Sequence, residues 1–142
     1  MQGRSKIVME NNNNLSRYVP IPYLNNLATR KAAGIATIII SRAGSAIFEI
    51  ASWGVPSIII PITNSNGDHQ RKNAYNYARS GACEVIDEAN LTPHVLISEI
   101  NKLMEDNTKL AKMKQSALSF ANPDAAFKIA DEAIKIAQSH ED

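Results

Sequence analysis

The stretch that decides the fold class covers residues 37–60 and reads TIIISRAGSAIFEIASWGVPSIII. It holds two short runs, residues 37–40 and Ser57–Ile60, in which every residue after the first is isoleucine. Continuous β-branched runs of this length are typical of parallel strands that are covered on both faces. Residues 45–53 between them indicate a short helix, which Gly54 ends. The stretch therefore predicts a strand–helix–strand unit with a right-handed crossover.

Further helices and strands are expected on both sides of this unit. In chain order they cover residues 17–19 (strand), 24–33 (helix, ended by Gly34), 68–80 (helix, ended by Gly81), 83–86 (strand) and three helices after Thr92. Strands that alternate with helices over short connections predict an α/β domain, a parallel sheet with flanking helices. We assign residues 1–15 to a disordered or frayed segment and residues 16–142 to one domain.

The composition is that of a globular protein of 142 residues, with 44% apolar and 20% charged residues. A formal net charge of +1 predicts neither a nucleic-acid surface nor a basic membrane anchor. The single cysteine, Cys83, cannot form an internal disulfide and suits a reducing compartment. No apolar stretch approaches the roughly 18 residues that span a bilayer. We therefore expect a cytoplasmic protein.

The order of elements also predicts where a ligand binds. In an open parallel sheet, ligands lie beyond the carboxyl ends of the strands, in the loops that lead to helices. This rule selects residues 41–45 and residues 61–70.

The first of these loops carries Gly44 and Ser45, and Glu49 follows one helical turn later. Gly44 lets the backbone approach a ligand closely, and Ser45 is expected to cap the next helix, whose N-terminus suits a diphosphate. The alternative is a tight turn with no ligand. Glu49 stands where a carboxylate can accept hydrogen bonds from two ribose hydroxyl groups. The alternative is a solvated glutamate on the surface.

The second loop ends in Asp68, expected to be an N-cap or first-turn acid. His69, Gln70 and Asn73 then offer groups that can bond sugar hydroxyls, and asparagine is unfavourable inside helices unless it has a local role. The three histidines are scattered along the chain, so we predict no metal site and no cofactor. No G-x-G-x-x-G follows a strand, which disfavours a dinucleotide-binding oxidoreductase.

Together these segments resemble a known family. Residues 40–45 (ISRAGS) and 48–56 (FEIASWGVP) are similar to its "SRAG…EIA..G.P" signature, and residues 68–74 (DHQRKNA) to its "HQ..NA" signature. The family is the MurG-like C-terminal domain of glycosyltransferase family 28. The resemblance runs from about Tyr18 to the end of the chain.

The resemblance implies a Rossmann-like part of a GT-B enzyme. Such enzymes transfer N-acetylglucosamine from UDP to lipid-linked muramyl-pentapeptide, with inversion and without a catalytic metal. In this chain, Glu49 would hold the ribose and Arg42 the diphosphate, with a structural ion pair as the alternative for Arg42. Residues of the second loop would bind the sugar or stabilise the loop. The residues implied to bind the donor are Arg42, Gly44, Ser45, Glu49, His69, Gln70 and Asn73.

The chain departs from the family pattern in several places. The segment from Arg42 to Glu49 is one residue shorter, which rotates Glu49 by about a third of a turn, and Thr37 replaces a common aspartate. The glycine-rich donor loop has no counterpart before Tyr18, and the acceptor domain with its base is absent. We therefore assign no catalytic residue and expect a partial enzyme, inactive alone. Its acceptor would bind through a missing N-terminal domain or a partner chain, on the inner face of the membrane.

Two other functions stay open at this point. A related transferase would use another UDP-sugar or another acceptor. A non-catalytic half of a split transferase would instead dock a partner, or a second copy as a homodimer, through the sheet edge expected at residues 17–19.

Overall fold

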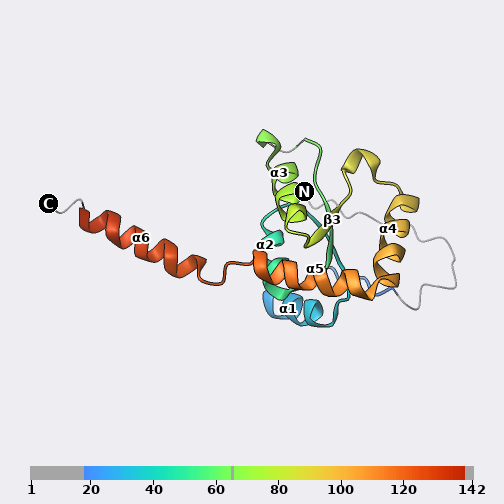
Figure 1. The fold of residues 1–142 in the computed structure, drawn as a ribbon, viewed down its shortest axis with the longest axis horizontal. Helices are drawn as coiled ribbons and strands as arrows, with labels where there is room; N and C mark the ends of the chain where they lie inside the picture. Colours follow the sequence, from blue (N-terminus) through green and yellow to red (C-terminus); the bar gives the residue numbers. More distant parts are fainter. Residues whose placement is uncertain (1–17, 65, 140–142) are drawn as a thin grey trace.

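The computed structural model describes residues 18–64 and 66–139, which form an α/β arrangement (Figure 1). Within these residues the sheet has three parallel strands in the order β1-β2-β3. The elements, with η for short 3₁₀ helices, are α1 (Asn26–Ile35), β1 (Ile39–Arg42), α2 (Ala46–Trp53), β2 (Ser57–Ile60), η2 (Asn66–Asp68), α3 (His69–Arg79), β3 (Cys83–Val85), η3 (Glu88–Asn90), α4 (Pro93–Glu105), α5 (Asn107–Phe120) and α6 (Ala125–Ser139). The predicted fold class is confirmed.

The central strand β2 is buried along its whole length because helices cover both faces of the sheet. Ile59 packs into one apolar cluster with side chains from α2, α3 and α5. Ile58 and Ile60 point to the opposite face, where they meet Leu103 of α4 and Met113 of α5. The isoleucine run therefore predicted the covering of β2 correctly, since strand side chains alternate between two buried faces.

The edge strand β1 begins later than its isoleucine run suggests. It covers Ile39–Arg42 because pairing with β2 starts at the register Ile39 with Ser57. Only one face of β1 is well covered, and the side chain of Ile40 is 45% exposed. Isoleucine content thus indicated the strand, and the pairing partner set its ends.

Two local predictions are wrong. Tyr18 and Val19 belong to no strand, and Arg17 lies outside the described residues. Their side chains are exposed, so no apolar face is buried there, and Pro20 cannot donate to a sheet ladder. Gly34 does not end α1, which continues to Ile35.

The α1 helix ends without a left-handed residue. The Ala36 N–H donates to the Ala33 carbonyl with Ala36 in an extended conformation, so no glycine is needed at this position. Thr92 caps α4, because its hydroxyl accepts a hydrogen bond from the Val95 N–H.

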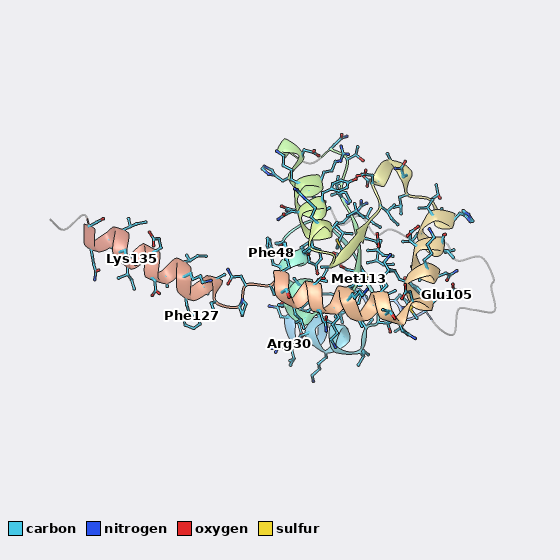
Figure 2. All side chains as sticks on the ribbon, in the orientation of Figure 1. Arg30, Phe48, Glu105, Met113, Phe127 and Lys135 are labelled. Carbon is cyan, nitrogen blue, oxygen red and sulfur yellow. The ribbon has the colours of Figure 1, made fainter. Side chains whose placement is uncertain are left out.

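The last helix, α6, extends away from the α/β body (Figure 1). None of its residues is buried, and Phe127 is 74% exposed. Figure 2 places Phe127 and Lys135 on this protruding helix. The apolar residues on α6 recur at helical spacing, and this stripe has no core to face within the described residues; it consists of Phe127, Ala130, Ile134 and Ala137. No helix among residues 18–64 and 66–139 is both long and apolar enough to cross a membrane.

Two glycines allow a test of this backbone. Gly54 ends α2 in the left-handed region (φ 64°), and an added Cβ would lie 2.8 Å from Cγ of Leu118. We expect Gly54→Ala to lower the free energy of unfolding by about 1–3 kcal/mol. At Gly34, inside α1, an added Cβ would meet no atom within 4 Å. Gly34→Ala should therefore raise the free energy of unfolding by about 0.5–1 kcal/mol. Urea unfolding of both variants measures the two changes in the free energy of unfolding. Equal changes would contradict the two predictions, which have opposite signs.

Candidate functional site

The carboxyl ends of the three strands lie at one edge of the sheet. Parallel pairing sets Arg42 opposite Ile60, and the chain after β3 continues beside them into Asp87 and Glu88. The loop after β2 and the beginning of α3 lie at the same edge, because Gln70 of α3 bonds to Ile62. We call this region the carboxyl edge.

Arg42 is the last residue of β1, and its guanidinium joins the neighbouring strand ends. Its NH2 group lies 2.8 Å from Oε1 of Glu88, and its NH1 group donates to the Ile60 carbonyl oxygen at 3.4 Å. The Arg42 side chain is 49% exposed, so it can also meet a ligand from solvent. The ion pair foreseen as the alternative role of Arg42 is thus present in the structure.

Glu88 uses both carboxylate oxygens at this edge. Oε1 pairs with Arg42, while Oε2 accepts hydrogen bonds from the Thr63 N–H at 3.0 Å and the Thr63 hydroxyl at 3.1 Å. The Thr63 hydrogen bonds and then Arg42 lower the pKa of Glu88 below its usual value, because all three favour the charged carboxylate. Glu88 was not among the predicted site residues, although it follows the predicted strand 83–86 by only two residues, which was a signal for it.

The loop after β1 leads into α2 without the expected cap. Ser45 has helical dihedral angles (φ −60°, ψ −22°) and its side chain makes no capping hydrogen bond. The prediction that Ser45 caps α2 is therefore wrong, since a capping side chain needs an extended backbone at that residue. An added Cβ at Gly44 would meet no atom within 4 Å, so the backbone there faces open space.

Glu49 lies on the exposed side of α2. The core side of this short helix is formed by Ile47, Ile50 and Ala51, which are buried. Glu49 is one turn after Ser45 and is itself exposed. A carboxylate in this place is accessible to a ligand, and its predicted contact with ribose stays a prediction.

The first turns of α3 connect the two loops that the sequence selected. Asn73 donates its Nδ2 hydrogen to the Ala43 carbonyl oxygen at 3.4 Å, and Gln70 Oε1 accepts from the Ile62 N–H at 3.1 Å. The structure thus gives Asn73 a local role inside the helix. Asn73 links residues 41–45 to α3, and Gln70 links the loop after β2 to the same helix.

The α3 helix starts at a strained residue. Asp68 stands at the N-cap position of α3, one of its two predicted places, but it has left-handed dihedral angles (φ 57°, ψ 26°) and its side chain makes no capping hydrogen bond. His69 follows as the first helical residue, with its ring next to Gly67. Non-glycine residues in this conformation are uncommon and concentrate at functional sites.

Asp87 forms a second set of polar contacts at the carboxyl edge. Asp87 lies 3.5 Å from Nε of Arg71 and accepts a hydrogen bond from the Tyr75 hydroxyl at 2.9 Å. A small cavity of about 140 Å³ lies here, lined in part by Thr63, Arg71 and Asp87. Both carboxylates that follow β3 are therefore tied to groups from other elements.

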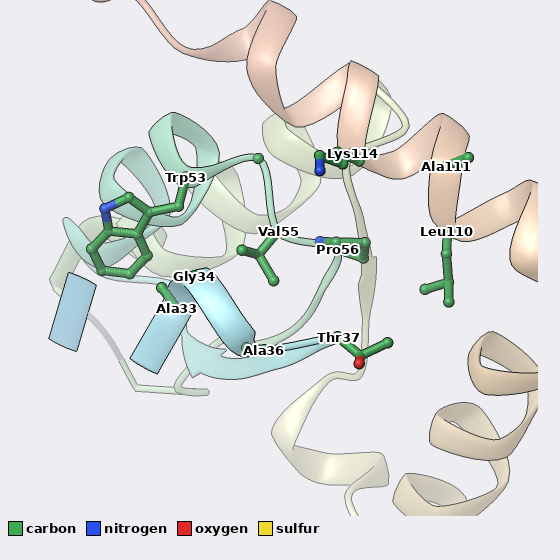
Figure 3. Close-up of a pocket in the computed structure, with 11 residues that line it drawn as sticks. Ala33, Gly34, Ala36, Thr37, Trp53, Val55, Pro56, Leu110, Ala111 and Lys114 are labelled. Carbon is green, nitrogen blue, oxygen red and sulfur yellow. The ribbon is translucent and has the colours of Figure 1, made fainter. Parts of the chain in front are cut away.

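Another cavity lies at the opposite edge of the sheet. It measures about 270 Å³ and is lined by residues before β1, such as Thr37, and before β2, such as Pro56, together with Trp53 and Lys114 (Figure 3). Its lining offers few polar groups. Among the described residues, no cluster of three or more His, Cys, Asp or Glu side chains is arranged to hold a metal ion.

A family model matches most of the chain. The sequence profile described as "Glycosyltransferase family 28 C-terminal domain" matches residues 2–129. The chain belongs to glycosyltransferase family 28. The family match begins before Tyr18 and ends within α6.

Curated family members give the same assignment. The transferase of Oenococcus oeni, named UDP-N-acetylglucosamine–N-acetylmuramyl-(pentapeptide) pyrophosphoryl-undecaprenol N-acetylglucosamine transferase, is 38% identical over 117 residues, which is 82% of this chain and 31% of the relative. The enzyme of the same name from Nostoc punctiforme is 36% identical over 115 residues, 80% of this chain and 32% of the relative. The chain thus spans about a third of the length of these family 28 transferases.

A solved structure of the family supports the fold. The crystal structure of Acinetobacter baumannii MurG matches with a TM-score of 0.72 and 32% identity, covering 81% of this chain and 33% of that one. The expected relation to the C-terminal domain of a family 28 transferase is therefore confirmed in sequence and in fold.

Proposed function

We propose that this chain is the donor-binding part of an inverting N-acetylglucosaminyltransferase that acts on lipid-linked muramyl-pentapeptide in peptidoglycan synthesis. The observation that carries the proposal is that α3 holds both loops at the carboxyl edge, the loop after β1 through Asn73 and the loop after β2 through Gln70, in a chain of family 28. Ligands of open parallel sheets bind at this edge. The names of the relatives supply the donor and the acceptor.

The donor would lie across the two loops. Glu49 would accept hydrogen bonds from the ribose hydroxyls, and Arg42 would contact the diphosphate as a cation from the end of β1. The backbone at Gly44 and Ser45 would approach the nucleotide and diphosphate at the N-terminal end of α2. Open space in front of Gly44 and the exposure of Arg42 support these positions.

The second loop would act mainly by holding its own shape. Gln70 and Asn73 bond to backbone groups of the two loops, which supports their assignment to loop stabilisation. His69, exposed at the start of α3, would then be the residue of this group that reads the sugar.

The chemistry of this part would be positioning and charge stabilisation. Transfer with inversion needs a base that removes the proton of the acceptor hydroxyl. That base and the lipid-linked acceptor would come from another domain or a partner chain, at the inner face of the membrane. This chain would orient the sugar carbon and stabilise the departing UDP through Arg42 and the α2 N-terminus.

A single substitution tests the proposal. We expect Glu49→Ala to weaken binding of UDP-N-acetylglucosamine by about 10- to 150-fold, because two charge-assisted hydrogen bonds of about 1.5–3 kcal/mol each are lost in part to water. Isothermal calorimetry on the purified chain measures this. The matched control is Glu105→Ala, an exposed glutamate at the end of α4. Equal affinity of Glu49→Ala and the control would remove the ribose role.

The sugar and the partner are separate questions. Competition among UDP-sugars in the same assay distinguishes N-acetylglucosamine from another sugar. The docking alternative is favoured by the outer edge of β1, which pairs only with β2 among the described strands and leaves Ile40 45% exposed. An open strand edge can pair with another chain. Concentration-dependent dimerisation without affinity for UDP-sugars would support docking instead of donor binding.

A further inference from the structure

One carboxylate links all three strand ends at the carboxyl edge. We propose that Glu88 is a positioning residue of the donor site, holding Arg42 and the loop at Thr63 in the arrangement that a nucleoside diphosphate requires. The proposal rests on the proposed function and adds a residue that is absent from the predicted site.

The contacts of Glu88 come from two different strand ends. Oε1 lies 2.8 Å from NH2 of Arg42, at the end of β1. Oε2 accepts from the N–H and the hydroxyl of Thr63, after β2, at 3.0 and 3.1 Å. Glu88 itself follows β3. One side chain therefore fixes the direction of the Arg42 guanidinium relative to the loop after β2.

Arg42 keeps donors for a ligand while it is held in this way. A guanidinium carries five N–H donors. The contact with Glu88 engages NH2, and the bond to the Ile60 carbonyl engages NH1. An arginine that is ordered before the ligand arrives loses less rotamer freedom on binding. Glu88 would thus raise donor affinity without touching the donor.

Glu88 also has an effect that acts against binding of the diphosphate. A carboxylate beside Arg42 adds negative charge near the diphosphate and competes with it for the guanidinium. If competition dominates, removing the charge of Glu88 should tighten binding. The sign of the change in affinity therefore separates positioning from competition.

The experiment is a double-mutant cycle on the 142-residue chain. Isothermal calorimetry with UDP compares the native chain with Glu88→Gln, Arg42→Ala and the double variant. We expect Glu88→Gln to weaken UDP binding by about 3- to 10-fold, which is the effect of ordering one long side chain. In the Arg42→Ala background the same substitution should change affinity by less than about 2-fold, because the group that Glu88 positions is gone.

Glu84→Gln is the matched control. Glu84 lies on β3 and pairs with Lys109 at 2.6 Å, and its side chain is 36% exposed, against 34% for Glu88. It loses an ion pair of the same kind away from the carboxyl edge, so UDP affinity should not change. Glu88→Asp keeps the charge but is one methylene shorter, so it cannot reach both Arg42 and Thr63 and should share the loss of Glu88→Gln.

Uridine provides a readout that a merely structural role would not move. It lacks the diphosphate, so its affinity should be equal in the native chain and in Glu88→Gln. Unchanged or tighter UDP binding by Glu88→Gln overturns the proposal, as does an equal loss in the Arg42→Ala background or with uridine. A native chain that binds no UDP would instead refute the proposed function and this inference together.

Discussion

Replacing Tyr77 by alanine should lower the free energy of unfolding by about 3–5 kcal/mol, the cost of removing a large buried aromatic ring. Tyr77 is fully buried on α3, and its ring lies 4.9 Å from the ring of Phe120 at an interplanar angle of 60°. It therefore connects α3 to the end of α5 within the cluster that contains Ile59. The cavity that Tyr77→Ala leaves lies at the junction of two helices and the sheet, where the surrounding residues cannot fill it fully.

Tyr77→Phe is the control for this prediction. The hydroxyls of Tyr77 and Ser57 are both buried, and neither has a hydrogen bond of normal geometry. Burial raises the pKa of Tyr77 to about 12, so the group stays neutral at physiological pH. Removing a hydroxyl that lacks a good partner should change stability by less than about 1 kcal/mol. Guanidinium chloride unfolding compares the two variants, and equal losses would show that the hydroxyl, and not the ring, stabilises the core.

Two of the three strands, β1 and β2, were predictable because each lies in or overlaps a run of isoleucine. The run at Ser57–Ile60 forms the central strand with the predicted limits. The run at residues 37–40 gave a strand shifted to Ile39–Arg42, because strand ends depend on the register with a neighbour that the run itself does not encode. The strand predicted at residues 17–19 is wrong at Tyr18 and Val19 for a related reason, since two apolar residues without a buried face are not held in a strand.

Helix ends were less predictable because they depend on backbone angles. Ser45 and Asp68 are both common N-cap residues, yet one is already helical and the other is left-handed, so neither side chain caps its helix. Gly34 carried the usual signal of a helix end, but an ordinary extended residue ends α1. Residue type alone gives a preference for such positions and does not fix the dihedral angles.

The location of the candidate site followed from topology, while its internal contacts did not. The rule for parallel sheets selected the loops after β1 and β2, and Asn73 and Gln70 tie each of these loops to α3. Glu88 was missed because its partners, Arg42 and Thr63, are distant in the sequence. They become neighbours only when the register of all three strands is known. The residues proposed to bind the donor stay predictions until a ligand is measured.

The second face of the sheet should be as sensitive as the first. Leu103 of α4 is fully buried against Ile58, Ile60 and Met113. Leu103→Ala should lower the free energy of unfolding by about 2–5 kcal/mol. Ile97, on the same helix but 56% exposed, is the control, and Ile97→Ala should change stability by no more than about 0.5 kcal/mol. Urea unfolding of both variants measures the difference.

This substitution also tests how the core supports the carboxyl edge. Ile60 packs on the cluster of Leu103 with its side chain, and its carbonyl oxygen accepts the hydrogen bond of Arg42. A cavity beneath Ile60 would loosen the strand end that Arg42 contacts, so Leu103→Ala should weaken UDP binding as well as stability. Among the described strands, β2 pairs only with the four-residue β1 and the three-residue β3, so no other strand holds it in place. A destabilised Leu103→Ala chain that still binds UDP like the native chain would show that the edge is held by its polar contacts alone.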